Sequence, residues 1–381
     1  MASIINIINT LRNSYFYLRT LDHMWVDHDT ICSGNNAVTA RCSVIGRQGY
    51  WLIKCYFRKK SNLKAIYGDN YYCNEFGIYS PTGRIEYIDI VLLPWVEGVP
   101  LNCFIGNPTT DYRALSRAFD RLALQLLESE YAHGDIKPDN IIVGHNLEMS
   151  LIDLDAMWRP EFGNSLPTEC GTAAYQHPKR KLNYYNKFID DYPLAIISTM
   201  LAALALDREL EHKLDKDKIL FDSDDCIYGD SRILSRVIDL FDKHNDMAHK
   251  QIAIGLRSSS LMIYGLHKMF YTALNGNDKG YSTPKHLDIA KQITPIKSSA
   301  HRHPAPHYSM NSGQRIRSKW TRDEELLLAT LLFDGNRLSN IAIYMGRSEK
   351  AIRQRIKELN LPLSALNLRK PIRPRTKGSR T

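Results

Sequence analysis

The stretch Tyr131–Asp155 gathers side chains of this chain that could do chemistry. It reads YAHGDIKPDN, IIVGHNLEMS and LIDLD, so Asp135 lies five residues before Asn140, and Asp153 lies thirteen residues after it. Carboxylate and carboxamide oxygens can orient a hydroxyl group or bind a hard cation such as Mg²⁺. The apolar residues IIV and SLI predict two short strands that fix this loop. A solvated turn rich in Asp, Asn and Pro is the alternative interpretation.

The pattern resembles the catalytic core of the protein-kinase family, written H-R-D-x-K-x-x-N followed by D-F-G. Phosphoryl transfer needs chiefly a carboxylate that orients the attacking hydroxyl and metal ions that hold the phosphates. The resemblance implies that Asp135 takes the hydroxyl and that Lys137 lies near the transferred phosphate. It also implies that Asn140 and Asp153 bind Mg²⁺, and it gives His133 a structural role. The resemblance also implies that ATP is the phosphoryl donor.

The segment from residue 31 to residue 58 resembles the first three strands of a kinase small lobe. Two β-rich runs, ICSGNNAVTARCSVI and YWLIKCYF, flank a turn at Gly46–Gly49. Lys54 in WLIK matches the lysine of V-A-I-K, which holds the α- and β-phosphates. Gly34 lies where the family has three glycines that let backbone amides approach the phosphates. Taken alone, Lys54 is better explained as a surface lysine on a strand; together with the downstream Asp135 loop, the phosphate-binding role is favoured.

Two further parts of a nucleotide site follow from the resemblance. Glu75 is expected on the next helix, as the acidic partner of Lys54. The run IDIVLLPWVEGVPL predicts a buried strand followed by a linker that contains Pro and Gly. It is similar to the fifth strand and hinge of a kinase, where backbone groups from Leu93 to Val96 would bind the adenine.

The downstream sequence resembles a kinase large lobe. DYRALSRAFDRLALQLLESE has apolar residues at helical spacing and predicts a helix over residues 111–130. GTAAYQHP is similar to G-T-x-x-Y-x-A-P-E, with His177-Pro178-Lys179 in place of Ala-Pro-Glu. Gly134 replaces the arginine of H-R-D, so the usual control by activation-segment phosphorylation is not expected. Asp190 matches the aspartate that braces the catalytic loop; a helix N-cap is a compatible alternative.

Composition limits the class of protein. The chain has 381 residues and 44% hydrophobic residues, enough for two or more domains. The seven cysteines form no Cys-x-x-Cys pair, which argues against a zinc site or a disulfide framework and favours a reducing cytosol. The N-terminus lacks a basic region ahead of an apolar one, so no secretory signal is expected. The longest apolar run, 192–206, has 15 residues, too few for a membrane span.

Positive charge is concentrated at the C-terminal end. Residues 296–381 contain 18 Lys and Arg against 6 Asp and Glu, a net charge of +12, whereas the whole chain carries +9. Residues 276–318 are rich in Gly, Asn, Ser, Pro and His and predict a linker. The histidines at 301, 303 and 307 could bind a metal, but a solvated tether is the favoured interpretation. The tail, residues 361–381, has no acidic residue and is expected to be disordered and to contact phosphates of a nucleic acid.

Residues 319–360 resemble the Myb/SANT-like helix-turn-helix family. The matching motifs are W-T-x-x-E-E, I-A-x-x-x-G-R-S and A-I-R-x-R. Thr321 and Ser348 are predicted N-caps of the first and third helices. On the third helix, Ile352, Ile356 and Leu359 should pack inward. The residues expected to face DNA in its major groove are Lys350, Arg353, Gln354 and Lys357, with Arg355 at the edge. A protein-interaction module of the SANT type is the alternative.

These observations predict an α+β two-lobed protein-kinase-like fold plus a small all-α three-helix domain. The expected units are a helical extension at 1–29, a small lobe at 30–97, a large lobe at 98–275, the linker, the helix-turn-helix domain and the tail. The expected function is an ATP- and Mg²⁺-dependent kinase that phosphorylates Ser or Thr of a protein and is brought to DNA. Alternatives are a pseudokinase that senses nucleotide and binds DNA, and a small-molecule kinase, which His133-Gly134-Asp135 would suit. A cytoplasmic location is expected, at the nucleoid, or in the nucleus if the host is eukaryotic.

Overall fold

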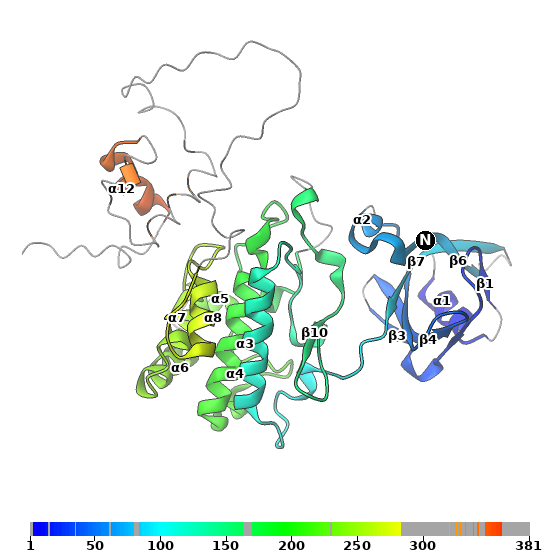
Figure 1. Ribbon diagram of the computed structural model, residues 1–381, viewed down its shortest axis with the longest axis horizontal. Coiled ribbons are helices and arrows are strands. Elements are labelled where there is room, and N and C mark those ends of the chain that lie inside the picture. Colours follow the sequence, from blue (N-terminus) through cyan, green and yellow to red (C-terminus); the bar gives the residue numbers. More distant parts are fainter. Residues whose placement is uncertain are drawn as a thin grey trace, which may run out of the picture.

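The fold is mixed α/β, with a curled antiparallel sheet near the N-terminus and a helical part after it (Figure 1). The computed structural model describes residues 3–13, 16–34, 36–60, 62–79, 84–162, 170–228, 231–282, 320, 325, 328, 332, 338, 341–342 and 347–359. These residues also form short 3₁₀ helices: η1 (His28–Thr30), η2 (Gly68–Asn70), η3 (Leu101–Cys103), η4 (Pro138–Asn140), η5 (Leu154–Ala156), η6 (Pro160–Phe162), η7 (Ala173–Tyr175), η8 (Lys187–Asp190) and η9 (Arg208–Lys213).

The N-terminal sheet has seven strands in the order β1-β6-β7-β5-β4-β2, with β3 also paired to β4. The strands are β1 (Tyr17–Leu18), β2 (Met24–Val26), β3 (Cys32–Ser33), β4 (Ala37–Val44), β5 (Trp51–Tyr56), β6 (Tyr71–Tyr79) and β7 (Ile85–Pro94). Along β4, buried and half-buried residues alternate from residue 38 onward, because successive side chains of a strand point to opposite faces. One face is covered by helix α1 (Ile4–Leu11), which buries Ile7 and Leu11 completely.

The described residues of the segment 1–29 do not form a separate helical extension. The helix expected there ends at Leu11, and its N-terminal residues Ile4 and Ile5 are 39% and 67% exposed. The following segment supplies β1, which pairs with β6, and β2, which pairs with β4. The segment therefore extends the sheet at both ends, which satisfies strand edges that would otherwise expose backbone groups.

The helical part is built around two long helices, α3 (Tyr112–Glu128) and α4 (Asp191–Leu206). The expected helix at 111–130 is confirmed: Asp111 caps α3 by accepting from two backbone N–H groups, and the apolar positions at 115, 119, 122 and 126 are buried. The remaining helices are α5 (Ser223–Tyr228), α6 (Arg232–Lys243), α7 (Met247–Gly255) and α8 (Leu266–Asn275). A small sheet, β8 (Val99–Pro100), β9 (Ile141–Val143) and β10 (Met149–Leu151), lies beside them in the order β10-β9-β8.

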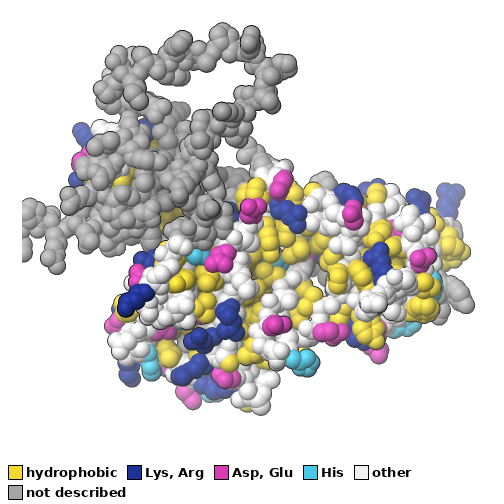
Figure 2. All heavy atoms as spheres, viewed as in Figure 1, with side chains coloured by type: hydrophobic (Ala, Val, Ile, Leu, Met, Phe, Trp, Pro, Cys, Tyr) yellow, Lys and Arg dark blue, Asp and Glu magenta, His cyan; other side chains and the backbone are white. Residues whose placement is uncertain are grey.

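One helical stretch in the described part of the chain, Lys187–Leu206, is long and apolar enough to cross a membrane by length and composition. However, 89% of it is buried inside the molecule, as expected for a core helix. Most residues of α4 are buried on every side, so the helix is apolar all round instead of amphipathic. On the face drawn in Figure 2, basic, acidic and apolar side chains are interspersed over the described residues.

The C-terminal helix α12 (Glu349–Glu358) begins where the sequence predicts. The Ser348 hydroxyl accepts a hydrogen bond from the Ala351 N–H, which confirms the N-cap. Ile352 and Ile356 are buried, and Leu359 is half-buried. Arg355 is half-buried at the edge of the helix. The residues expected to point outward are exposed: Lys350, Arg353, Gln354 and Lys357. The Thr321 cap, most of the linker and the basic tail lie outside the described residues.

A buried ionic network ties three helices of the helical part together. Asp120 on α3 accepts from the Ser198 hydroxyl of α4 at 2.7 Å and lies 3.1 Å from Nε2 of His249 on α7. Asp246 lies 2.7 Å from the other ring nitrogen of His249. Burial opposes the charged imidazole, but hydrogen bonds and charges of the two aspartates outweigh burial and raise the pKa of His249 to about 10. The protonated imidazole therefore stabilises the folded state.

We expect this network to make unfolding pH-dependent. Because the pKa of His249 is raised from 6.5 to about 10 on folding, its contribution is complete below pH 6.5 and is lost as the pH rises toward 10. Over that interval His249 should add a slope of up to about 1.4 kcal/mol per pH unit to the free energy of unfolding. Urea unfolding at several pH values measures the slope. His249→Gln should fold less stably and show a shallower slope; an unchanged slope would contradict the assignment.

Candidate functional site

The loop that carries the candidate catalytic residues is braced from α4. Both carboxylate oxygens of Asp190, at the start of α4, accept hydrogen bonds from the loop backbone, one from the His133 N–H and one from the Gly134 N–H at 2.8 Å. Nε2 of His133 lies 2.9 Å from the carbonyl oxygen of Ile152, just after β10. Asp190 and His133 thus occupy positions that hold the loop against the strand leading to Asp153.

Asp135 lies at the centre of the loop with both carboxylate oxygens engaged. One accepts from the Thr172 N–H at 2.6 Å, and the other accepts from the Asn140 carboxamide at 3.1 Å. The ammonium group of Lys137 donates to the Thr172 hydroxyl at 3.0 Å and lies 3.6 Å from Asp135. The Asn140 N–H₂ group also donates to the Asp135 carbonyl at 2.8 Å, which directs the nitrogen of the carboxamide toward the loop. Asn140 and Thr172, which lie 5 and 37 positions after Asp135, therefore hold its carboxylate in one orientation.

Lys54 reaches this region from the N-terminal sheet. Its side chain is buried on β5, and its Nζ lies 2.6 Å from Oδ1 of Asp153 and 3.0 Å from Oδ1 of Asp155. Burial opposes the charged ammonium, but the two aspartates outweigh burial and raise the pKa of Lys54 above its ordinary value. Lys54 is therefore a cation held between two carboxylates, and the Asp153 side chain remains 44% exposed.

Asp155 was not singled out by the sequence as a site residue, yet it has more partners than Asp153. It accepts from the hydroxyls of Tyr56 and Tyr67 at 2.7 and 2.6 Å, and from Nζ of Lys60 at 3.0 Å. Burial raises the pKa values of both tyrosines, so their hydroxyls remain protonated donors. Burial also opposes ionisation of Asp155, but the lysines and tyrosines lower its pKa to about 2. The sequence offered one signal, an aspartate where the kinase motif has glycine.

The expected pairing of Glu75 with Lys54 is wrong. Glu75 lies on strand β6, not on a helix, and is 1% exposed. Its carboxylate accepts from the N–H groups of Arg19, Thr20 and Leu21 at 3.0, 2.7 and 2.8 Å, and from the Thr20 hydroxyl at 2.7 Å. The aromatic and β-branched neighbours of Glu75 favour a strand, and α2 (Leu63–Tyr67) is the short helix found between β5 and β6. Glu75 therefore holds the N-terminal segment in place.

The other expected nucleotide contacts lie along the same sheet. The Gly34 N–H donates to the Ala37 carbonyl at 2.9 Å and closes the turn between β3 and β4. Leu93 on β7 pairs with Leu52, two residues before Lys54 on β5, and Val96 follows β7 as a half-buried residue. Gly34 thus lies just after β3, Leu93 lies on β7 and Val96 just after it, and their binding of ATP stays a prediction.

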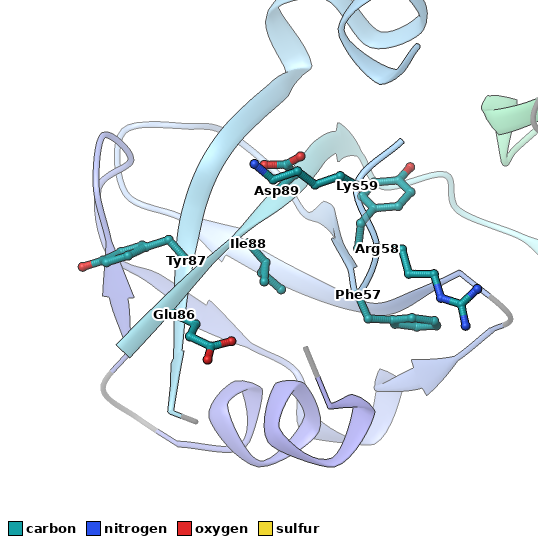
Figure 3. Close-up of a pocket in the computed structure, with 8 residues that line it drawn as sticks. Phe57, Arg58, Lys59, Glu86, Tyr87, Ile88 and Asp89 are labelled. Atoms are coloured by element: carbon teal, nitrogen blue, oxygen red, sulfur yellow. The ribbon is translucent and has the colours of Figure 1, made fainter. Parts of the chain in front are cut away.

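A cavity of about 420 Å³ opens at the N-terminal sheet (Figure 3). It is lined by residues 56–59, at the end of β5, and by residues 86–89 of β7. Asp135, Asn140 and Asp153 are not among its lining residues. Tyr56 is shared, because it lines the cavity and its hydroxyl also contacts Asp155. We assign the candidate chemistry to the loop and not to this cavity, because the residues able to orient a hydroxyl lie at the loop.

Comparison with known proteins provides no family for the chain. No protein-family model matches the sequence, and no curated protein resembles it significantly. The candidate site therefore has to be judged from its own geometry and chemistry.

Gly134 has no room for a side chain. Its φ is +85°, in the left-handed region, and a Cβ atom there would lie 2.2 Å from the Ala156 carbonyl oxygen. This close approach explains why glycine stands where the kinase motif has arginine. It also keeps the Asp135 loop in contact with the segment that follows Asp155.

Gly134→Ala should therefore destabilise the protein more than a matched glycine substitution. Gly46→Ala is the control, since Gly46 has φ +77° and a Cβ atom there would meet nothing within 4 Å. Gly46→Ala should cost about 1 kcal/mol from the backbone conformation alone. Gly134→Ala should cost about 1–3 kcal/mol more because of the overlap with Ala156. Urea unfolding of both variants measures the difference, and equal losses would show that the overlap is relieved by a small shift.

Proposed function

We propose that this chain is an ATP- and Mg²⁺-dependent kinase that phosphorylates serine or threonine of a protein. The observation that carries the proposal is two pairs of contacting side chains, on segments that are joined by a hydrogen bond from the Ile152 N–H to the Asn140 carbonyl at 2.9 Å. Lys54 from the N-terminal sheet meets Asp153, which follows β10, and Asp135 and Asn140 lie on the loop before β9. These residue types are the ones phosphoryl transfer requires for positioning and charge stabilisation.

The arrangement of the elements supports the proposal. Strands β4, β5, β7 and β6 are neighbours in that order, with Lys54 in β5, and the chain then enters the helical part. The loop with Asp135 follows α3, and Asp190 at the start of α4 braces it. A two-lobed kinase-like fold would place the nucleotide between the sheet and this loop.

The side chains divide the chemistry among themselves. Asp135, whose oxygens are fixed by the Thr172 N–H and Asn140, would orient the attacking hydroxyl and accept its proton. Lys137, which donates to the Thr172 hydroxyl, would contact the transferred phosphate. Lys54 would contact the phosphates nearer the nucleoside. Each role places a charge or a proton acceptor where the reaction develops charge.

The donor set also fits Mg²⁺. Asp153 is partly exposed, and the Asn140 carboxamide directs its nitrogen to Asp135, so that its oxygen can serve as a ligand. Among the described residues there is no cluster of three or more His, Cys, Asp or Glu side chains that could hold a metal. This is the usual situation for Mg²⁺, which is held by one or two carboxylates together with substrate phosphates. When bound, Mg²⁺ would neutralise phosphate charge.

A pseudokinase is the second candidate. It is favoured by the burial of Glu75 away from Lys54 and by Gly34 as the single glycine in its loop. In that case the chain would sense nucleotide without transferring phosphate. A small-molecule kinase remains the third reading, but Lys137 favours a protein acceptor.

Transfer of the labelled γ-phosphoryl group from ATP with Mg²⁺ to a generic protein acceptor tests the proposed kinase activity. Wild-type protein should label the acceptor or itself, and Asp135→Ala should lower the rate by at least about 10²-fold, because the hydroxyl loses its base. Asp135→Ala should still bind ATP, since Asp135 is not expected to contact the nucleotide. Asp153→Ala should abolish labelling, and Asp69→Ala, an exposed carboxylate of the sheet region, is the control. Nucleotide binding without any transfer in wild type would favour the pseudokinase.

We further propose that the C-terminal part binds DNA. One side of α12 buries Ile352 and Ile356. The exposed residues of the same helix include Lys350, Arg353, Gln354 and Lys357. The buried residues join Leu328, Leu332, Leu338, Ile341 and Ala342 in a hydrophobic cluster of their own. A helix with a basic exposed side on a small hydrophobic core suits entry into the major groove.

The double variant Lys350→Ala, Lys357→Ala should weaken DNA binding and lower its salt dependence. Each phosphate contact contributes about 0.9 to the slope of log affinity against log salt, so the slope should fall by up to about 2. The control is Lys64→Ala, Lys213→Ala, which removes two exposed lysines elsewhere. Fluorescence anisotropy with duplex DNA at several salt concentrations measures the affinity and its salt dependence for both double variants. Unchanged affinity after removal of residues 319–381 would instead favour a protein-interaction module.

A further inference from the structure

The buried Lys54 needs an acidic partner that stays in place when Asp153 binds a metal ion. In this chain Glu75 cannot serve, because backbone N–H groups of the N-terminal segment occupy its carboxylate. Among the residues that the structure describes, Asp155 is the remaining carboxylate in contact with Lys54, at 3.0 Å. We propose that Asp155 is the positioning residue that orients Lys54 toward the phosphates of ATP. This inference rests on the proposed kinase function and deepens it.

The two aspartates beside Lys54 differ in exposure and in partners. The Asp155 side chain is 4% exposed, whereas the Asp153 side chain is 44% exposed. Asp155 accepts from two tyrosine hydroxyls and Lys60, whereas among the described residues Asp153 has a side-chain contact with Lys54 alone. Asp153 is thus free to turn toward a cation, and Asp155 is not. A division of roles follows, with Asp153 as metal ligand and Asp155 as fixed anion.

Donors from three successive segments fix Asp155. The Tyr56 hydroxyl comes from the end of β5, two residues after Lys54, and the Tyr67 hydroxyl comes from the end of α2. Both donate to Oδ1, the same oxygen that faces Lys54, while Lys60 between the two segments binds Oδ2. Charge-assisted hydrogen bonds of this kind are short and directional. The position of Oδ1, and hence of the Lys54 ammonium, is therefore set by β5 and α2.

The backbone brings both carboxylates to one lysine. Asp153 has φ +64°, and the η5 turn follows it at once. The turn carries the side chain at 155 back toward β5, so carboxylates two positions apart meet the same Nζ atom. When Asp153 turns to a cation, Lys54 keeps Asp155 as its partner and stays directed at the phosphate site.

Nucleotide binding to the full-length chain in EDTA tests the proposal. Isothermal titration should compare ATP with adenosine, because adenosine lacks the phosphates that Lys54 would contact. Asp155→Asn should weaken ATP binding by about tenfold, which is the loss expected for one charge-assisted contact, and leave adenosine binding unchanged. The control, Asp69→Asn, removes the same charge from an exposed position and should change neither affinity.

The outcomes separate the possible roles of Asp155. An equal loss for ATP and adenosine would indicate a merely structural residue, and a loss seen only with Mg²⁺ would indicate a metal ligand; either result overturns the proposal. If Asp155→Asn fails to fold, the double variant Tyr67→Phe, Lys60→Met, which keeps the carboxylate but removes two of its donors, should show the same selective loss for ATP. ATP binding that is equal in wild type and Asp155→Asn overturns this inference alone. A wild type that binds neither ATP nor adenosine overturns the nucleotide-dependent function as well.

Discussion

The contact between Lys54 and the aspartates at 153 and 155 connects the two parts of the molecule on which the proposed chemistry depends. A lysine buried in a sheet requires opposite charge nearby, because an isolated ammonium in the protein interior is strongly disfavoured. Here that charge comes from residues 99 and 101 positions later in the chain. The N-terminal sheet is therefore held to the segment after β10 by an ion pair, because the buried charge of Lys54 is compensated by aspartates of that segment.

A second constraint acts on the loop around Asp135. Asp190 binds successive backbone N–H groups of the loop, and Gly134 allows the backbone to approach Ala156 at a distance that no side chain permits. Asp135 is in turn held by Thr172 and Asn140. The loop is thus positioned by backbone groups and buried carboxylates, so the orientation of Asp135 does not depend on flexible surface side chains. Such preorganisation is what a reaction that relies on positioning requires.

The carboxylates of Glu75 and Asp155 are similarly buried, but they bind different groups of the protein. Glu75 binds the backbone of residues 19–21 and secures the segment that leads from α1 into the sheet. Asp155 binds the side chains of Tyr56, Tyr67 and two lysines, and it adjoins the candidate metal ligand Asp153. The acidic partner of Lys54 therefore comes from the segment that carries the candidate metal ligand Asp153. Under the proposed function, nucleotide and metal sites would share one ionic cluster.

The sequence by itself determined the features that depend on local chemistry. The sequence predicts local features, because periodicity and capping act within a few residues. These features are the spacing of Asp135, Asn140 and Asp153, the amphipathic helix α3 and the Ser348 cap of α12. Only the tertiary structure decided the partner of Lys54 and the place of residues 1–29 in the sheet. Both depend on groups that are distant in the sequence and meet only after folding. Burial and pairing across such distances leave no periodic signal in a single chain.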